Sequence, residues 1–224
     1  MRRTGAGVVV LVVLVGAVLV VDLVLRDQAE RRIATEVQQA IPGVAEPPSV
    51  AIEGFPFLTQ VAASRLGSVR LSAPEATVEG LRLEDVVVRV HGVTTEPPYV
   101  AESAELTALA RPDDVEAVLG LPDMDLGVDD GELVATADVL GIPVDIALGV
   151  RPAGREVVVD VVALEMGGFR VDSSELPAAL AAQLEGLRFA ISGLPEGMVL
   201  TDVVVVADGV RLSAAAEHLA IGTL

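Results

Sequence analysis

The hydrophobic pattern of the chain begins with an apolar run over residues 5–25, made of Val, Leu, Ala and Gly with Asp22 as its only charged residue. A helix of about 20 apolar residues spans the core of a bilayer. Residues 1–4 include two arginines, which favour a cytoplasmic N-terminus. We therefore expect an uncleaved signal-anchor over residues 5–26, a cytoplasmic tip before it, and the rest of the chain on the extracytoplasmic side of the cell membrane.

A cleaved signal peptide is the alternative interpretation of this run. Val15-Gly16-Ala17 resembles a small-residue cleavage site, but the apolar run continues beyond it and no polar region follows. The chain contains no Cys, so a bacterial lipoprotein anchor is excluded.

An amphipathic segment follows the run. Residues 27–41 carry an apolar residue at every fourth position, which places these residues on one face of a helix. The apolar positions are Ala29, Ile33, Val37 and Ile41. Pro42-Gly43 ends the pattern. We expect a stalk helix over 27–41 that continues the anchor and packs back on an extracytoplasmic domain of residues 42–224.

Alternation of apolar and polar residues dominates the rest of the chain and predicts β-strands. The predicted strands are 49–53, 68–79, 81–91, 99–109, 132–138, 142–150, 155–165, 168–172, 187–192, 198–207 and 209–215. Two short helices interrupt them: residues 111–119, where Pro and two Asp suit a first turn, and residues 174–185, where Ser174 can cap the helix. The expected fold class is α+β, rich in antiparallel strands.

Three valine-rich segments depart from this alternation, because they are apolar on both sides. They are Val86–Val88, Val157–Val162 and Val203–Val206, with Asp160 as the one polar residue among them. The sequence has too few long helices to cover both faces of a sheet. One interpretation is a strongly curved sheet wrapped on helices, with an apolar groove left over. The other is a sandwich with buried central strands, and the pattern does not distinguish a filled core from a lipid tunnel.

Charge and composition exclude several functions. The net charge is −18, with 15 basic residues that are all Arg. Nucleic-acid binding needs clustered basic residues, so this function is excluded. Because the net charge is negative, the chain as a whole is not attracted electrostatically to anionic lipid surfaces. Because there is no Cys, an exported domain must depend on its core rather than on disulfides.

A search for catalytic patterns finds none. His91 and His218 are the only histidines, and neither has a partner at zinc-ligand spacing. The chain has no Gly-x-Ser-x-Gly, His-Glu-x-x-His or phosphate-binding glycine loop. The acidic segment 123–132 fails as a calcium loop, because Val128 and Val134 occupy the sixth and twelfth positions. We interpret it as a solvated turn between strands, with a metal site of another type as the minor alternative. We expect no cofactor, no metal and no enzyme activity.

The most distinctive segment is Gly54-Phe55-Pro56-Phe57-Leu58-Thr59-Gln60, directly after the first predicted strand. Gly54 permits unusual dihedral angles, and Pro56 restricts Phe55 to an extended conformation. These residues predict a rigid apolar turn. The turn is either a plug over one end of the core or an apolar lip where acyl chains enter.

At this segment the chain resembles the LmeA-like phospholipid-binding proteins of actinobacterial cell envelopes. The resemblance rests on the N-terminal anchor, on the stretch Val50–Gln60 with its Gly-Phe-Pro-Phe-Leu motif, and on the strands after it. It includes the turn Gly193–Met198 leading into Val210–Leu212, and it covers most of residues 30–222. It implies a curved sheet with helices, similar to tubular lipid-binding domains, that holds phospholipid in an apolar cleft. In mycobacterial members the family is tied to elongation of the mannan of envelope lipoglycans, and no catalytic residues come with the resemblance.

The leading hypothesis is an anchored extracytoplasmic protein that binds a phospholipid or glycolipid by its acyl chains and supports the assembly of envelope lipids or lipoglycans. Burial of apolar area drives such binding at roughly 25 cal/mol per Å² and needs few polar groups. The candidate lipid-binding residues are Phe55, Phe57, Leu58, Val86, Val88, Phe169, Leu180 and Phe189. The candidate headgroup contacts are Arg65, Arg70 and Arg89.

Two other functions stay open. A scaffold domain with a dry core would recruit an envelope glycosyltransferase, or another envelope protein, through a sheet edge or an acidic face. A hydrolase or transferase ranks third, since no triad or metal spacing supports it. Bound acyl chains would distinguish the leading hypothesis from the scaffold.

Overall fold

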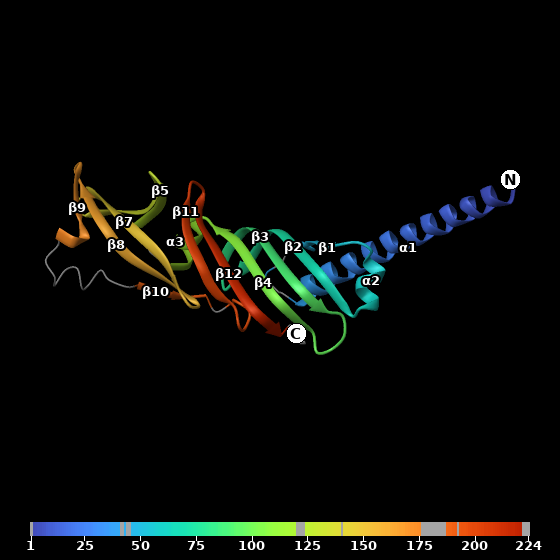
Figure 1. Cartoon of the computed structure of the whole chain (residues 1–224). Helices are drawn as coiled ribbons and strands as arrows, with labels where there is room; N and C mark the ends of the chain where they lie inside the picture. Colours follow the sequence, from blue (N-terminus) through green and yellow to red (C-terminus); the bar gives the residue numbers. More distant parts are fainter. Residues whose placement is uncertain are drawn as a thin grey trace.

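The protein is elongated, with a long helix leaving one end of a domain built from two antiparallel sheets (Figure 1). The computed structural model describes residues 2–40, 43, 46–119, 124–139, 141–175, 187–191 and 193–220. The long helix is α1, Arg2–Ala40. We name the sheet next to α1 the proximal sheet and the other one the distal sheet.

The proximal sheet has the strand order β1-β2-β3-β4-β12-β11, and each neighbouring pair is antiparallel. Its strands are β1 Ser49–Glu53, β2 Arg65–Val78, β3 Leu81–Thr94, β4 Val100–Ala110, β11 Val199–Val206 and β12 Gly209–Ala220. A short helix, α2 Phe57–Ala62, joins β1 to β2. Successive side chains of each strand point to opposite faces of the sheet, and we name the face that carries Val88 the inner face and the opposite one the outer face.

The distal sheet has the order β10-β8-β7-β6-β5, with β9 paired to β8. Its strands are β5 Met124–Asp129, β6 Glu132–Val139, β7 Ile142–Ala153, β8 Glu156–Met166, β9 Phe169–Asp172 and β10 Leu187–Ala190. Helix α3, Pro112–Leu119, leads from the proximal sheet into the distal one and contacts β3 and β5.

Two hydrophobic cores hold this arrangement. The larger core lies between the sheets, where buried residues of β4, β11 and β12 meet Leu126 and Leu133 of the distal sheet. The smaller core joins α1 to β1, α2 and β2. Its buried members are Ala34, Val50, Ile52, Phe57, Leu66 and Val69. Ala29 and Ile33 of the predicted helical stripe pack against this smaller core, which confirms that this helix packs on the domain.

A polar contact strengthens the seam between α1 and β1. The Oε1 atom of Glu30 accepts a hydrogen bond from the backbone N–H of Ile52 at 2.8 Å, and another from Arg26 Nε at 2.8 Å. Ile52 belongs to an edge strand, whose outward N–H groups would otherwise lack a protein partner. Glu30 therefore satisfies a backbone donor of this edge while staying in an ion pair on its own helix.

The N-terminal part of α1 carries the apolar run. Its described side chains from Val18 to Leu25, apart from Asp22, are 39–60% exposed. Within the described part of the chain, no helix combines the length and the apolar character that a membrane crossing needs. The anchor over residues 5–26 stays a prediction.

The strands and α3 confirm most of the expected elements. All the predicted strands are present, and several are longer, since β3 reaches Thr94 and β12 reaches Ala220. The helix expected over 111–119 is α3. Of the helix expected over 174–185, the structure describes only a 3₁₀ turn at Ser173–Glu175, and the remainder lies outside the described residues.

The interpretation of the acidic segment 123–132 as a solvated turn is wrong for most of its length. Residues 124–129 form β5, and only Asp130 and Gly131, both with positive φ, make the turn into β6. Alternation explains the strand: Leu126 packs into the core, while the acidic residues beside it remain on the other face.

The expected α+β class with antiparallel strands is confirmed. Strong curvature around helices stays a prediction, because the strands divide between two sheets whose edges do not join.

Candidate functional site

The Gly54–Gln60 segment forms the start of α2 and the turn before it. Gly54 has a φ of +94°, in the left-handed region that favours glycine. A Cβ atom at this position would also lie 3.0 Å from Nε2 of Gln60. Pro56 is extended, with a ψ of 145°, and precedes the first helical residue, Phe57. The predicted apolar turn is present at this segment, and a helix that sequence reasoning missed follows it.

Asp22 of α1 caps this short helix from a distance of 35 residues in the chain. Its Oδ2 accepts a hydrogen bond from Phe57 N at 3.0 Å, and its Oδ1 accepts one from Leu58 N at 2.7 Å. Helix termini leave their first N–H groups without partners, and no side chain of α2 itself caps them. Asp22 is only 1% exposed. We name this contact the α1–α2 clamp.

The side chain of Gln60 connects this segment to the backbone of β1 and β2. Its Nε2 donates to the carbonyl oxygen of Glu53 at 3.2 Å, and its Oε1 accepts from the N–H of Gly67 at 2.8 Å. Gln60 thereby ties the end of β1 to the start of β2. Thr59 donates its hydroxyl to the carbonyl of Pro56 at 2.7 Å. The polar residues of the motif have structural partners within the proximal sheet and its turn.

The two phenylalanines of the motif have opposite environments. Phe57 is 7% exposed and belongs to the smaller core, so its position is that of a plug. Phe55 is 62% exposed and lines an open hollow of about 420 Å³. Arg65 lines the same hollow, together with Gly54 and Gly67. The structure therefore brings together one predicted lipid contact and one predicted headgroup contact. Leu58 is half-buried at the start of α2.

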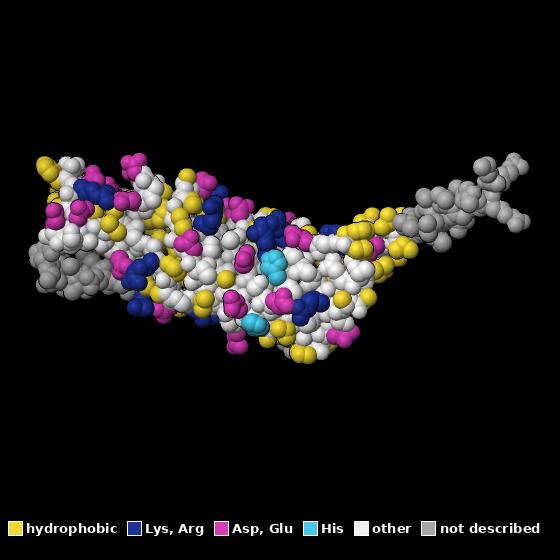
Figure 2. Space-filling view, in the orientation of Figure 1, with side chains coloured by type: hydrophobic (Ala, Val, Ile, Leu, Met, Phe, Trp, Pro, Cys, Tyr) yellow, Lys and Arg dark blue, Asp and Glu magenta, His cyan; other side chains and the backbone are white. Residues whose placement is uncertain are grey.

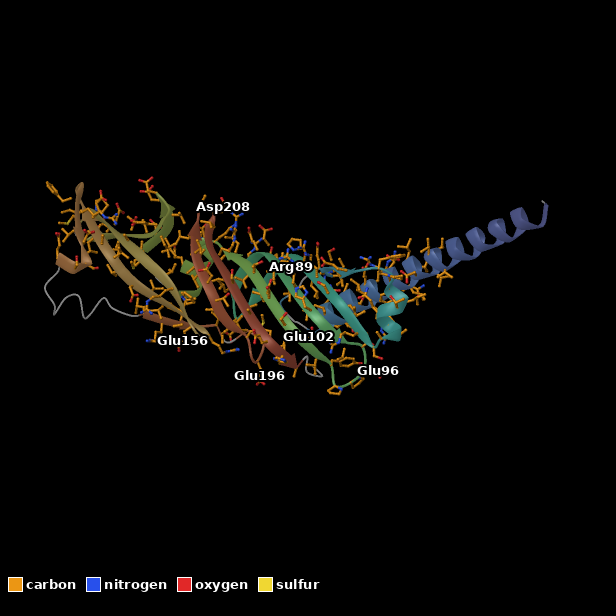
Figure 3. The ribbon with its side chains drawn as sticks, in the orientation of Figure 1. Arg89, Glu96, Glu102, Glu156, Glu196 and Asp208 are labelled. Carbon is orange, nitrogen blue, oxygen red and sulfur yellow. The ribbon has the colours of Figure 1, made fainter. Side chains whose placement is uncertain are left out.

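The three candidate arginines occupy two places. Arg65 forms an ion pair with Glu102. Arg70 and Arg89 are direct cross-strand neighbours on β2 and β3. Arg89 lies on the outer face of the proximal sheet (Figure 3), and Arg70, as its direct cross-strand neighbour, lies on the same face. Arg70 has its Nε 4.0 Å from Glu53, and this buried nitrogen has no hydrogen-bond partner among the described residues.

Val88 lies on the inner face of the proximal sheet. Leu71 on β2, Val88 on β3 and Leu106 on β4 are direct cross-strand partners, and all three are half-buried. We name these three residues the inner row. Leu71 packs against the smaller core, whereas Val88 and Leu106 pack against the larger one. The inner row thus links the two cores and keeps part of its apolar surface accessible. Val86, also half-buried, packs against the larger core.

Phe169 and Phe189, two further candidate residues, lie in the distal region and do not join this site. Phe169 is 80% exposed on β9, and Phe189 is half-exposed on β10. Leu180 lies outside the described residues. Sequence reasoning placed these residues with Phe55 because they are large and apolar, and that property gives no information on which sheet a residue joins.

A second hollow, of about 460 Å³, lies on the distal sheet and is acidic. Its walls include Asp125, Asp129, Asp145 and Glu165, and Gly127 lies among its small lining residues. Arg170 also lines it. The two oxygens of Glu132 accept hydrogen bonds from Arg170 at 3.0 and 3.1 Å, and this contact raises the pKa of Arg170 above its usual value. Among the described residues, no group of three or more His, Asp or Glu is placed to hold a metal ion.

The late turn Gly193–Met198 docks on the β7–β8 hairpin. Arg155, in that hairpin, donates hydrogen bonds to the carbonyl oxygens of Leu194, Pro195 and Met198, the last two at 2.8 and 3.2 Å. The N–H of Leu200 donates to the carbonyl of Gly154 at 2.7 Å. The turn therefore links the two sheets, which gives the second segment of the sequence resemblance a structural role.

The surface reflects the difference between the two ends. Hydrophobic side chains gather on the described part of α1 where it leaves the domain, while acidic and basic side chains are interspersed over the sheets (Figure 2). Many of the arginines are paired with acids, as in Arg82–Glu75 at 2.6 Å and Arg188–Glu156 at 3.1 Å.

A comparison with protein families finds a match over most of the chain. The family model described as LmeA-like phospholipid-binding matches residues 20–215, which is most of the chain. Comparisons with curated proteins and with solved structures find no match. The matched range begins in the apolar part of α1, includes Asp22 and the Gly54–Gln60 segment, and covers both sheets except the end of β12.

Proposed function

Because the chain belongs to the LmeA-like phospholipid-binding family, we propose that it is a membrane-anchored extracytoplasmic protein that holds a phospholipid or glycolipid by its acyl chains. The observation that carries this proposal is the inner row. Leu71, Val88 and Leu106 lie in the middle of a sheet, where side chains are usually fully buried, yet each retains part of its exposure. Accessible apolar surface at such a position favours an apolar ligand.

Acyl chains lying along the inner row would bind through the hydrophobic effect. Burial of a few hundred Å² of apolar surface at about 25 cal/mol per Å² contributes on the order of 10 kcal/mol before the entropy cost of binding. No catalytic group is required, and the protein acts as a carrier or sensor of lipid rather than as an enzyme. This mode of binding also suits an acidic chain, because it does not depend on attraction of the anionic headgroup.

We place the entrance for the acyl chains at the hollow beside Phe55. Phe55 provides an exposed aromatic wall, and Arg65 in the same hollow can exchange its pair with Glu102 for a headgroup phosphate. Arg70 and Arg89 are weaker candidates for the headgroup, since the sheet separates the outer face from the inner row. Phe57 supports the entrance from the core and does not itself form the lip.

Anchoring and the envelope role complete the proposal. The exposed apolar turns of α1 from Val18 to Leu25 support a membrane anchor over 5–26, because a helix that is apolar all round is stable only when it is covered. Support of envelope lipid or lipoglycan assembly, with an envelope glycosyltransferase as a partner, rests on the sequence resemblance alone.

A matched pair of variants tests the acyl site. Val88 belongs to the inner row. Val87, the preceding residue on the same strand, lies on the outer face, where Ser72 and Thr107 are its cross-strand partners. After incubation of the full chain with phosphatidylglycerol or phosphatidylinositol vesicles, lipid bound to the repurified protein is measured. We expect V88W to retain severalfold less lipid than the wild type, and V87W to retain the wild-type amount. Equal retention by both variants would contradict the acyl site, and no lipid on the wild type would favour the scaffold function.

A further inference from the structure

We propose that α2 rests on the surface of the bilayer beside α1, with Phe55 and Val61 inserted at the level of the lipid headgroups, so that the hollow at Phe55 opens directly at the membrane. This inference rests on the anchoring role proposed above. It adds an interaction surface whose partner is the phospholipid bilayer itself.

The α1–α2 clamp fixes the position of α2 relative to the anchor. Both carboxylate oxygens of Asp22 are bonded to backbone N–H groups of α2, at 3.0 and 2.7 Å, and the side chain is almost completely buried. A charged acceptor that is withdrawn from water and doubly bonded resists separation, because each lost bond would leave a buried polar group without a partner. Helix α2 therefore moves with α1 as one unit.

The length of α1 before the clamp places this unit at the membrane edge. Residues 5–21 are helical, and 17 residues at 1.5 Å each extend about 25 Å. The hydrocarbon core of a bilayer is about 30 Å thick. If this stretch crosses the bilayer, Asp22 lies close to its outer boundary. A carboxylate is costly inside a membrane, and the two N–H partners are what makes Asp22 acceptable at this depth.

Exposed apolar residues lie beside the clamp. Phe55, two residues before Phe57, is 62% exposed, and Val61 on α2 is 41% exposed. They continue the apolar surface of α1, where Leu19 and Leu25 lie one turn before and after Asp22 and are about 40% exposed. Such a surface inserts into the boundary between headgroups and acyl chains. The contact is apolar by necessity, since a chain with a net charge of −18 gains nothing from anionic headgroups.

Tryptophan fluorescence tests the contact, because the chain has no Trp of its own. The full chain carrying Phe55→Trp is reconstituted into phosphatidylcholine vesicles whose acyl chains are brominated near the headgroup. Phe169→Trp is the matched control, since Phe169 is an exposed phenylalanine on the distal sheet. We expect the F55W emission to be blue-shifted and quenched by more than half, and the F169W emission to be unaffected by bromine. Equal quenching of the two variants would overturn the proposal.

Two further measurements separate this inference from the functions on which it rests. Flotation of the vesicles reports anchoring, so protein that floats with unquenched F55W contradicts only the surface contact, whereas protein that does not float contradicts the anchor. In detergent micelles with one equivalent of brominated lipid, F55W should be quenched clearly less than in vesicles, because only a carried lipid can then reach the hollow at Phe55. If F55W in micelles were quenched as strongly as in vesicles, the signal would come from a carried lipid, and the bilayer contact would be overturned.

A clamp variant tests the same contact. Asp22→Asn in the F55W chain should reduce the quenching in vesicles while flotation is unchanged.

Discussion

The two ends of the molecule use acidic residues in opposite ways. At the proximal end, Asp22 is 1% exposed, and each of its oxygens binds a backbone N–H of α2. On the distal sheet, Asp125, Asp145 and Glu165 surround an open hollow. A carboxylate buried with good partners fixes two helices together, whereas carboxylates around an open hollow keep that surface hydrated. This difference supports the proposal that the proximal end is the part that meets an apolar partner.

The same contrast holds for the aromatic residues. Phe57 at the proximal end is enclosed by α1 and β1, and Phe55 beside it is exposed next to the anchor helix. On the distal sheet, Phe169 is exposed without such surroundings, beside residues such as Arg170 and Asp172. An exposed phenylalanine therefore has a different meaning at each end, and the proposed membrane contact applies only to the proximal one.

The largest expected effect is on stability, from truncation of Phe57. Phe57→Ala should lower the free energy of unfolding by about 3–5 kcal/mol, because it leaves a cavity in the smaller core. Phe55→Ala should change it by less than about 0.5 kcal/mol, as is usual for an exposed position. Denaturant unfolding of the full chain in detergent measures both. Similar losses for the two variants would contradict the assignment of Phe57 as plug and Phe55 as lip.

Removal of the clamp should have the next largest effect. Asp22→Ala leaves the N–H groups of Phe57 and Leu58 without their charged acceptor, at a cost of about 2–3 kcal/mol. Hydrogen exchange should show faster exchange of these two amides. Among the described residues, Asp145 accepts one hydrogen bond, from the hydroxyl of Thr136, so Asp145→Ala on the distal sheet should cost about 1 kcal/mol. If the Asp145 variant lost more stability than the Asp22 variant, the contrast between the two ends would be wrong.

The smallest effect is expected on the distal surface. Arg170→Ala removes exposed pairs with Glu132 and Asp172, and such pairs contribute little in water. Neither the melting temperature nor the amount of retained lipid should change measurably. A marked loss of retained lipid in this variant would indicate that lipid binds at the distal hollow. The contrast between the two ends would then be wrong.

Much of the fold could be predicted from local patterns. Period-two alternation identified the strands, and Pro112 with the two acids after it identified α3, because these signals depend on neighbours in the sequence. Strand β5 was missed because its acids on the outer face concealed the alternation of Leu126 and Val128. The division into two sheets also has no local signal, since a strand pattern does not specify its partner.

The candidate site was predicted only in part, for the same reason. Phe55 and Arg65 were identified and do share a hollow, because the Gly54–Gln60 segment is distinctive by itself. The role of Asp22 was missed, since its partners lie 35 and 36 residues away. A signal was nevertheless present: one acid within an otherwise apolar helix requires a partner, and the short helix after Pro56 lacks a cap of its own.

Native mass spectrometry of the full chain, followed by lipid extraction, tests the central claim most directly. The chain is released from detergent in the gas phase after incubation with phospholipid vesicles, and its mass is compared before and after denaturation. We predict one phospholipid for each protein molecule, retained until the chain unfolds. A protein mass without lipid, unchanged after incubation with vesicles, would contradict phospholipid binding and favour a scaffold with a dry core.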